Sequence, residues 1–147
     1  MFGVHCIKAQ SSLQSAVSLS SGESEYYAAV QGAALGLGVR ALLEDWRVPV
    51  RVTIVIATDS TAAMGFASRR GLGKLRHAST RYLWLQERVA RREVHVEKVH
   101  TSVNRAGVLT KPTAAPRASQ LIGDMGIEFR TGRASSAKGT LMNETPV

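Results

Sequence analysis

Residues 52–60, which read VTIVIATDS, are the stretch that decides the fold of this chain. Alternate residues of an extended strand face opposite sides, and here both sets are largely apolar: Ile54 and Ile56 on one side, Val55 and Ala57 on the other. Apolar residues on both faces are typical of a strand buried on both sides in the middle of an α/β sheet. The sequence therefore predicts a central strand over residues 52–57, with Asp59 at its carboxyl end.

Upstream of this strand we expect a long helix that begins at Ser20. Ser20 and Glu23 have the spacing of a capping box, in which each side chain satisfies a free backbone N–H group. Apolar residues then follow at close to the helical period: Tyr26, Val30, Ala33, Leu37 and Ala41. Gly32, Gly36 and Gly38 weaken the helix but allow another backbone to approach closely, so we expect it to pack tightly on the sheet. Residues 1–19 are expected to be extended, with a strand near 4–8 and a half-buried strand ending at Leu19.

Downstream, the pattern predicts further helices and one more strand. Asp59 or Ser60 would cap a short helix to residue 67, and a basic, glycine-containing loop follows over 68–77. A second long helix would have an inner stripe of Ala78, Tyr82, Leu85 and Val89, ahead of an edge strand over 94–99. Short helices are expected over 105–110, capped by Asn104, and over 117–126. This order predicts an α/β domain over residues 1–128 and a disordered Ser- and Gly-rich tail over 129–147.

The composition limits the class of protein and its partners. The 147 residues fit one domain, and 19 Lys and Arg against 11 Asp and Glu give a net charge of +8. Such an excess favours nucleic acid as a partner, although a soluble protein that is simply basic is an equal reading. Cys6 is the single cysteine, which excludes an intramolecular disulfide and suits a reducing compartment. Neither a membrane span nor a secretory signal is evident, so we expect an intracellular protein, cytoplasmic or nuclear.

Two carboxylates stand where an α/β sheet places ligands. Glu25 lies in the first turn of the long helix, and Asp59 follows the central strand, at whose carboxyl end a crevice forms in open α/β sheets. Nucleases that transfer phosphoryl groups use such acids to hold two Mg²⁺ ions about 4 Å apart. The structural alternatives are that Glu25 complements the helix dipole and that Asp59 is an N-cap.

The basic loop is the second candidate site. Its cationic residues could hold backbone phosphates, and its glycines would let the chain approach them closely: Arg69, Arg70, Lys74, Arg76 and His77. A solvated loop without a ligand is the alternative. A structural hydrogen-bonding role for His77 is equally open.

Five blocks occur in order along residues 5–112, among them VSLSSGESEYYA at 17–28 and VLTKP at 108–112. Together they resemble the ribonuclease H domains of copia-type retrotransposons. Residues 17–28, VSLSSGESEYYA, are similar to that family's signature at the start of its helix, and residues 7–14 resemble its preceding strand. The further blocks are ATDSTAA at 57–63, GLGKLRH at 71–77 with LWLQE at 83–87, and VLTKP at 108–112.

The resemblance implies an RNase H-like mixed sheet of five strands flanked by helices, and a Mg²⁺-dependent enzyme that cleaves the RNA strand of RNA–DNA hybrids. Glu25 and Asp59 match two of the family's acidic residues. The matched region begins after the family's first strand, and Gly107 stands in place of its last acidic residue. The resemblance thus implies a truncated domain that lacks the first strand and two of four carboxylates.

Such a domain is expected to be catalytically degenerate. His100 matches a loop where some ribonucleases H keep a proton-shuttling histidine, but a surface histidine is the alternative. The expected partners are an RNA–DNA hybrid and an upstream reverse transcriptase segment. A non-catalytic nucleic-acid-binding module and a product without a function of its own are the other readings.

Overall fold

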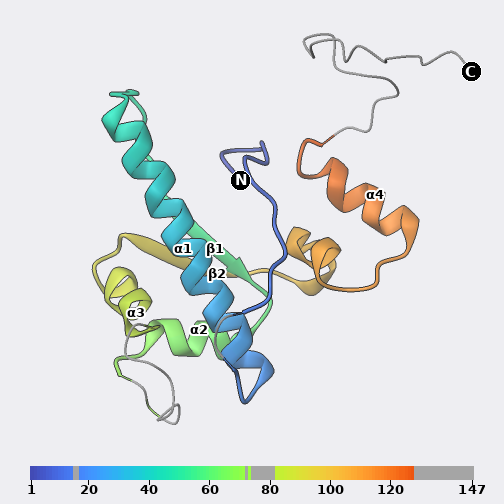
Figure 1. Ribbon diagram of the computed structural model, residues 1–147, viewed down its shortest axis with the longest axis horizontal. Helices are drawn as coiled ribbons and strands as arrows, with labels where there is room; N and C mark the ends of the chain where they lie inside the picture. Colours follow the sequence, from blue (N-terminus) through green and yellow to red (C-terminus); the bar gives the residue numbers. More distant parts are fainter. Residues whose placement is uncertain (15–16, 72, 74–81, 128–147) are drawn as a thin grey trace, which may run out of the picture.

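A computed structural model describes residues 1–14, 17–71, 73 and 82–127 of the chain. Within them the fold is mixed α/β, as predicted (Figure 1). The elements run in the order α1 (Ser21–Asp45), β1 (Ile54–Thr58), α2 (Thr61–Ser68), α3 (Leu83–Ala90), β2 (Val94–Lys98), the 3₁₀ helices η2 (Thr101–Val103) and η3 (Arg105–Leu109), and α4 (Ala115–Gly123). Predictions for Lys74, Arg76, His77, Ala78 and the tail 129–147 lie outside the described residues.

The start of α1 confirms the predicted capping box. The Ser20 hydroxyl accepts a hydrogen bond from the Glu23 N–H at 3.2 Å, and the Glu23 carboxylate accepts one from the Leu19 N–H at 2.9 Å. Glu23 is fully buried, and the Tyr27 hydroxyl donates a hydrogen bond to its other carboxylate oxygen. The capping carboxylate is therefore also part of the buried polar structure beneath α1, so its desolvation is compensated.

The two strands pair in parallel and are covered on one face by helices. Ile54 of β1 lies opposite Val94 of β2, and Thr58 lies opposite Lys98. A Cβ atom at Gly36 would lie 3.0 Å from Ile54 Cγ2, so the predicted close packing of α1 on the sheet is confirmed at this glycine. Helices α2 and α3 lie beside α1 on the same face (Figure 1). The core forms between these layers, from Tyr26, Tyr27, Ala29, Ala33, Ile54, Ala63, Ala67, Tyr82, Leu85 and Val94.

The prediction that the central strand is buried on both faces is wrong in the described part of the chain. Ile54 and Thr58 are buried, but Val55 between them is 45% exposed. The helices cover the face of Ile54, and the described residues place no equivalent layer over Val55. Apolar composition on both faces therefore predicted more cover than the described residues provide.

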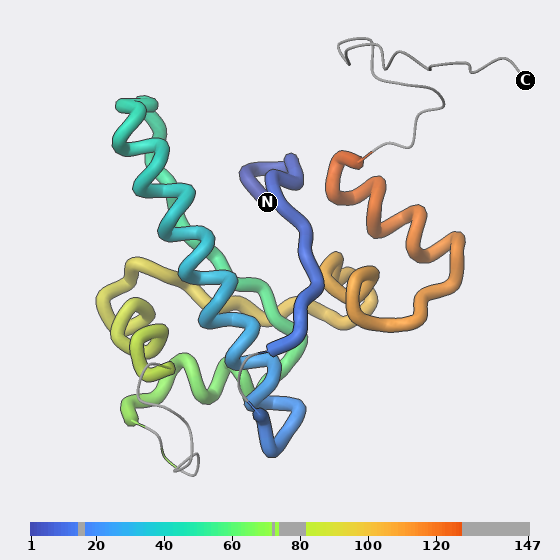
Figure 2. Tube along the Cα trace, viewed as in Figure 1, coloured from blue at the N-terminus to red at the C-terminus, as the bar shows by residue number. Residues whose placement is uncertain are grey.

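The strands expected within residues 1–19 are also not observed. The described residues of this segment make one isolated bridge, between Phe2 and His5, and Val17 and Leu19 are 85% and 73% exposed. A strand needs a paired neighbour to satisfy its backbone, and the described residues of this segment have none in register. In Figure 2 the segment runs as an extended trace past one edge of the sheet towards the start of α1.

The remaining elements follow the prediction with shifted bounds. Ser60 rather than Asp59 caps α2, because the Ser60 hydroxyl accepts the Ala63 N–H at 3.1 Å. Asn104 caps η3 as expected, and that helix is 3₁₀. Helix α4 starts two residues before the predicted position, with Pro116 in its first turn. In the described part of the chain, no helix has the length and apolar character that crossing a membrane requires.

Candidate functional site

Asp59 lies at the carboxyl end of β1, as predicted, but its carboxylate already has partners. Lys111 Nζ lies 3.5 Å from Asp59 Oδ2, and the Asp59 side chain is only 11% exposed. Partial burial raises the pKa of Asp59, but the hydrogen bond from the Thr101 side chain and the charge of Lys111 outweigh it and hold the pKa below its usual value. Lys98 Nζ also donates to the Asp59 backbone carbonyl at 3.0 Å. The carboxylate is thus ionised and paired with a cation of its own chain.

Glu25 lies near the same end of the sheet. Helix α1 runs antiparallel to β1, because Gly36 packs on Ile54 while Gly32, one turn earlier, packs near Ile56. The next turns of the helix towards its start therefore reach the end of the strand. Glu25 is exposed and lines the same cavity as Thr58, Asn104 and Ala106.

Gly107, at the position where the resemblance implied an acidic residue, lies in η3. A Cβ atom built on it would have no other atom within 4 Å, so the position has room for a side chain. The Gly107 carbonyl accepts hydrogen bonds from the N–H groups of Thr110 and Lys111, at 3.3 and 3.0 Å. This turn brings Lys111 back towards Asp59. Gly107 and the lysine that pairs with Asp59 therefore belong to one short turn.

His100 has a local structural contact. Its Nδ1 accepts the Ser102 N–H at 3.2 Å and lies 2.7 Å from the Ser102 hydroxyl, so the ring caps η2. Because Nδ1 accepts a hydrogen bond from the backbone, the ring's proton is on Nε2 when the histidine is neutral. The side chain is exposed. This geometry leaves Nε2 as the group that a proton-shuttle role would use.

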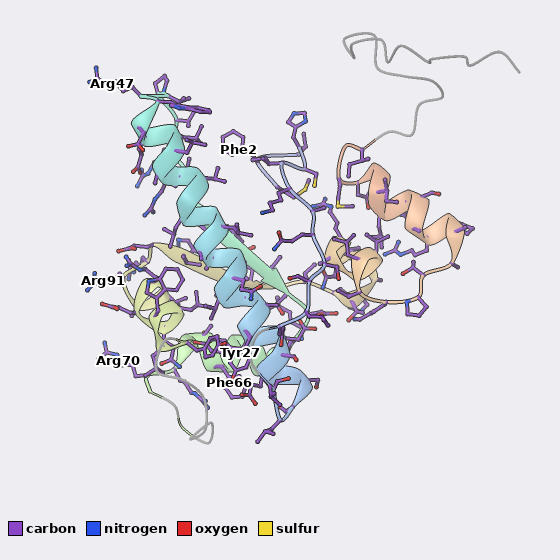
Figure 3. All side chains as sticks on the ribbon, viewed as in Figure 1. Phe2, Tyr27, Arg47, Phe66, Arg70 and Arg91 are labelled. Atoms are coloured by element: carbon purple, nitrogen blue, oxygen red, sulfur yellow. The ribbon has the colours of Figure 1, made fainter. Side chains whose placement is uncertain are left out.

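Of the two described arginines of the basic loop, Arg69 contacts α2 and Arg70 lies beside α3. The Arg69 guanidinium stacks over the Phe66 ring at 4.4 Å from its centroid, and Arg70 is exposed. Arg70 and Arg91 flank a shallow depression on α3, and Figure 3 shows both projecting from the same side of the molecule. Arg91 lies 2.6 Å from Glu87. We call this depression, with Arg70, Gly71, Gln86, Glu87 and Arg91 around it, the basic depression.

Gln86 fixes the start of the basic loop, a role that the sequence analysis missed. The Gln86 side chain accepts the Gly71 N–H at 2.8 Å and donates to the carbonyls of Phe66 and Gly71, at 2.8 and 3.1 Å. It is buried next to Leu85 in α3. A polar residue adjacent to the apolar stripe of a helix was the available signal, because a buried amide requires partners. Gln86 thus positions Arg70 at the rim of the depression.

Lys111 and Thr101 were also missed as neighbours of Asp59. Nothing in the spacing of residues 59, 101 and 111 indicates that they meet, since they come from three separate turns. In the part of the chain that the structure describes, no group of three or more His, Cys, Asp or Glu side chains could hold a metal ion. Two carboxylates, one of them paired with Lys111, are a poor match for two divalent cations, which need several oxygen ligands.

The chain is similar to part of a known polyprotein. It is 30% identical over 111 residues, or 75% of its length, to a protein described as "Retrovirus-related Pol polyprotein from transposon TNT 1-94" from Nicotiana tabacum. The aligned region is 8% of that polyprotein, so the chain spans a small part of its relative. No family model matches the chain, and no solved structure matches it. The similarity supports an origin in a retrotransposon polyprotein.

Proposed function

We propose that this chain derives from the RNase H-like part of a retrotransposon polyprotein and binds RNA–DNA hybrid without cleaving it. The observation that carries the proposal is the paired state of Asp59. In a metal-dependent nuclease this carboxylate would coordinate a cation, whereas here the Lys111 ammonium lies 3.5 Å away. Gly107 adds no carboxylate from the same turn. The carboxyl end of β1, where Asp59 and Lys111 lie, is therefore better suited to a phosphate backbone than to two Mg²⁺ ions.

The charge of the surface supports the binding half of the proposal. The net charge of +8 favours a polyanion, and Arg70 lies on one side of α3 with Arg91, whose guanidinium also pairs with Glu87. Gln86 holds the loop backbone at Gly71, so Arg70 starts from a fixed position and less conformational entropy is lost when a phosphate binds. Lys74, Arg76 and His77 complete the proposed phosphate-binding set. Such contacts give affinity without a sequence preference.

Fluorescence anisotropy with a labelled RNA–DNA hybrid tests this half of the proposal. The double substitution Arg70→Gln and Arg91→Gln is expected to weaken binding and to reduce the slope of log affinity against log salt by about 2, since each lost phosphate contact removes about 0.9. The matched control is Arg40→Gln with Arg117→Gln, which removes the same charge from α1 and α4. An equal effect of the two pairs would mean that only net charge matters.

The pairing of Asp59 with Lys111 also bears on a second candidate function, metal-dependent cleavage of the hybrid. If the chain had a metal-dependent activity within a longer polyprotein, a Mg²⁺ ion held partly by a carboxylate from an upstream reverse transcriptase segment would have to displace the Lys111 ammonium from Asp59. Adding a fragment of such a segment from the same polyprotein should then produce Mg²⁺-dependent cleavage. Absence of cleavage in that mixture favours the binding function, and cleavage favours the enzyme.

A further inference from the structure

A large cavity runs along the edge of β1 that faces away from β2. Its volume is about 700 Å³, and its walls come from α1, residues 51–58 that include β1, residues 1–10, and Asn104 and Ala106 near η3. Gly32 and Gly36 line it from the helix, Val55 and Ala57 from the strand, and Ile7 and Lys8 from the opposite wall. We call this cavity the edge slot. It separates the open edge of the sheet from an extended segment of the same chain.

The backbone of β1 presents unpaired groups to the edge slot. The Thr58 carbonyl accepts the Val99 N–H at 2.9 Å, so the backbone groups of Thr58 point towards the β2 side. Because these groups alternate along a strand, those of Val55 and Ala57 point into the slot. Among the described residues, no backbone group from the slot side is hydrogen-bonded to Val55 or Ala57. An open strand edge of this kind is a template for another strand.

The chain connection places residues 1–10 on the correct side of β1 for pairing. Strand β1 reaches its parallel partner β2 through α2 and α3, and residues 1–10 reach β1 through α1, which lies on the same face. Crossovers between parallel strands are right-handed in nearly all proteins. Two right-handed crossovers with helices on one face advance in the same direction across a sheet. The spatial order across the sheet must then be residues 1–10, then β1, then β2.

The sequence of this segment suits a strand. Val4, Cys6 and Lys8 would face one side and His5, Ile7 and Ala9 the other, and Ile7 is 57% exposed where it now lies. The Cys6 N–H donates to the Met125 carbonyl at 3.2 Å, which ties the segment to the end of α4. Pairing with β1 would give the open backbone groups of the strand edge hydrogen-bond partners. The strand expected near residues 4–8, absent from the observed arrangement, would then form.

We propose that residues 4–8 cross the edge slot and pair with β1 as a third, parallel strand. Pairing closes the sheet from within the chain. It supplies no carboxylate, because residues 1–19 contain neither Asp nor Glu. The inference stands on the edge geometry and does not depend on nucleic-acid binding.

Chemical crosslinking through Cys6, the single cysteine, tests the proposal in the whole chain. In separate variants, Val55→Cys and Ala57→Cys place a second thiol at the slot edge, and a short bismaleimide links thiols that come close. The control is Glu97→Cys, which lies opposite Ala57 in the register but on β2, one strand farther from the slot. Both slot variants should form intramolecular crosslinks at least severalfold faster than the control, measured by intact mass. Equal rates, or no crosslink in either slot variant, would overturn the proposal.

Hydrogen exchange gives a second readout that needs no added thiol. Proline at residue 7 removes a backbone donor and disfavours a paired strand, so Ile7→Pro should speed the exchange of the Val55 and Ala57 amides severalfold. Leu13→Pro, at an exposed residue outside the predicted strand, is the matched control and should leave both rates unchanged. Exchange at Val55 and Ala57 that is insensitive to Ile7→Pro would contradict strand pairing.

Discussion

The two faces of β1 differ in how completely the chain covers them. On one face, Ile54 packs against α1, and Leu85 of α3 is fully buried in the adjoining core. On the other face Val55 is 45% exposed, and the strand edge borders the edge slot. Both faces carry apolar residues, Ile54 and Ile56 on the first and Val55 and Ala57 on the second. The difference shows that the composition of a strand indicates which of its faces could be buried. Whether a face is buried depends on the helices or segments that pack on it.

The largest expected effect comes from a truncation on the covered face. Leu85→Ala should lower the free energy of unfolding by about 2–5 kcal/mol, because it opens a cavity among residues that cannot fully collapse. Val55→Ala, on the other face, should cost less than about 1 kcal/mol, since the side chain is nearly half exposed. Urea denaturation of the two variants measures both values. A cost at Val55 equal to that at Leu85 would show that the second face is covered in solution.

Two glycines of α1 offer a second comparison, between a closely packed position and an open one. A Cβ atom at Gly22 would lie 2.6 Å from Ala62 Cβ, so Gly22→Ala should force α1 and α2 apart and cost about 1–3 kcal/mol. A Cβ atom at Gly38 would have no neighbouring atom within 4 Å. Gly38→Ala should therefore stabilise the protein by up to about 1 kcal/mol through helix propensity. Thermal unfolding of the pair should shift in opposite directions; a shared direction would refute the assigned packing.

The smallest expected effect concerns the ion pair at the end of β1. The pKa of Asp59 is held below its usual value, so the stability this group contributes is present above the unfolded pKa of about 3.9 and is lost as pH falls through the lower folded pKa. The loss should be below about 1 kcal/mol, because Lys111 is largely solvent-exposed.

Urea midpoints at pH 7 and pH 3 measure this loss. The unchanged chain should lose more stability between these values than Asp59→Asn does. Lys111→Met serves as the matched control, because it removes the partner and leaves the carboxylate. Identical losses in the unchanged chain and in Asp59→Asn would show that the pairing contributes nothing.

Local signals in the sequence predicted local structure well. The capping pair Ser20 and Glu23, the cap at Asn104 and the glycine at residue 36 all depend on neighbours close in the chain or on helix packing, and the structure confirms each. Cover of the second face and pairing of residues 1–19 depend on which strands lie adjacent, which no local pattern encodes.

For the candidate site, the sequence predicted the position of Asp59 but not its partners. Glu25 and Asp59 could be placed near one end of the sheet because helix starts and strand ends meet there in α/β folds. The pairing with Lys111 and Thr101 required three separate turns to converge. The buried Gln86 shows the same limit, since its hydrogen-bond partners, Gly71 and Phe66, lie 15 and 20 residues away in the chain.

Cleavage of an RNA–DNA hybrid by the purified chain tests the central claim most directly. With Mg²⁺ and labelled RNA, the chain should bind the hybrid but cleave it no faster than Asp59→Asn does. Gly107→Asp, at a position with room for a side chain, is the informative companion variant, because it places an acidic residue in the turn that leads to Lys111. Mg²⁺-dependent cleavage by the unchanged chain that disappears in Asp59→Asn would contradict the account.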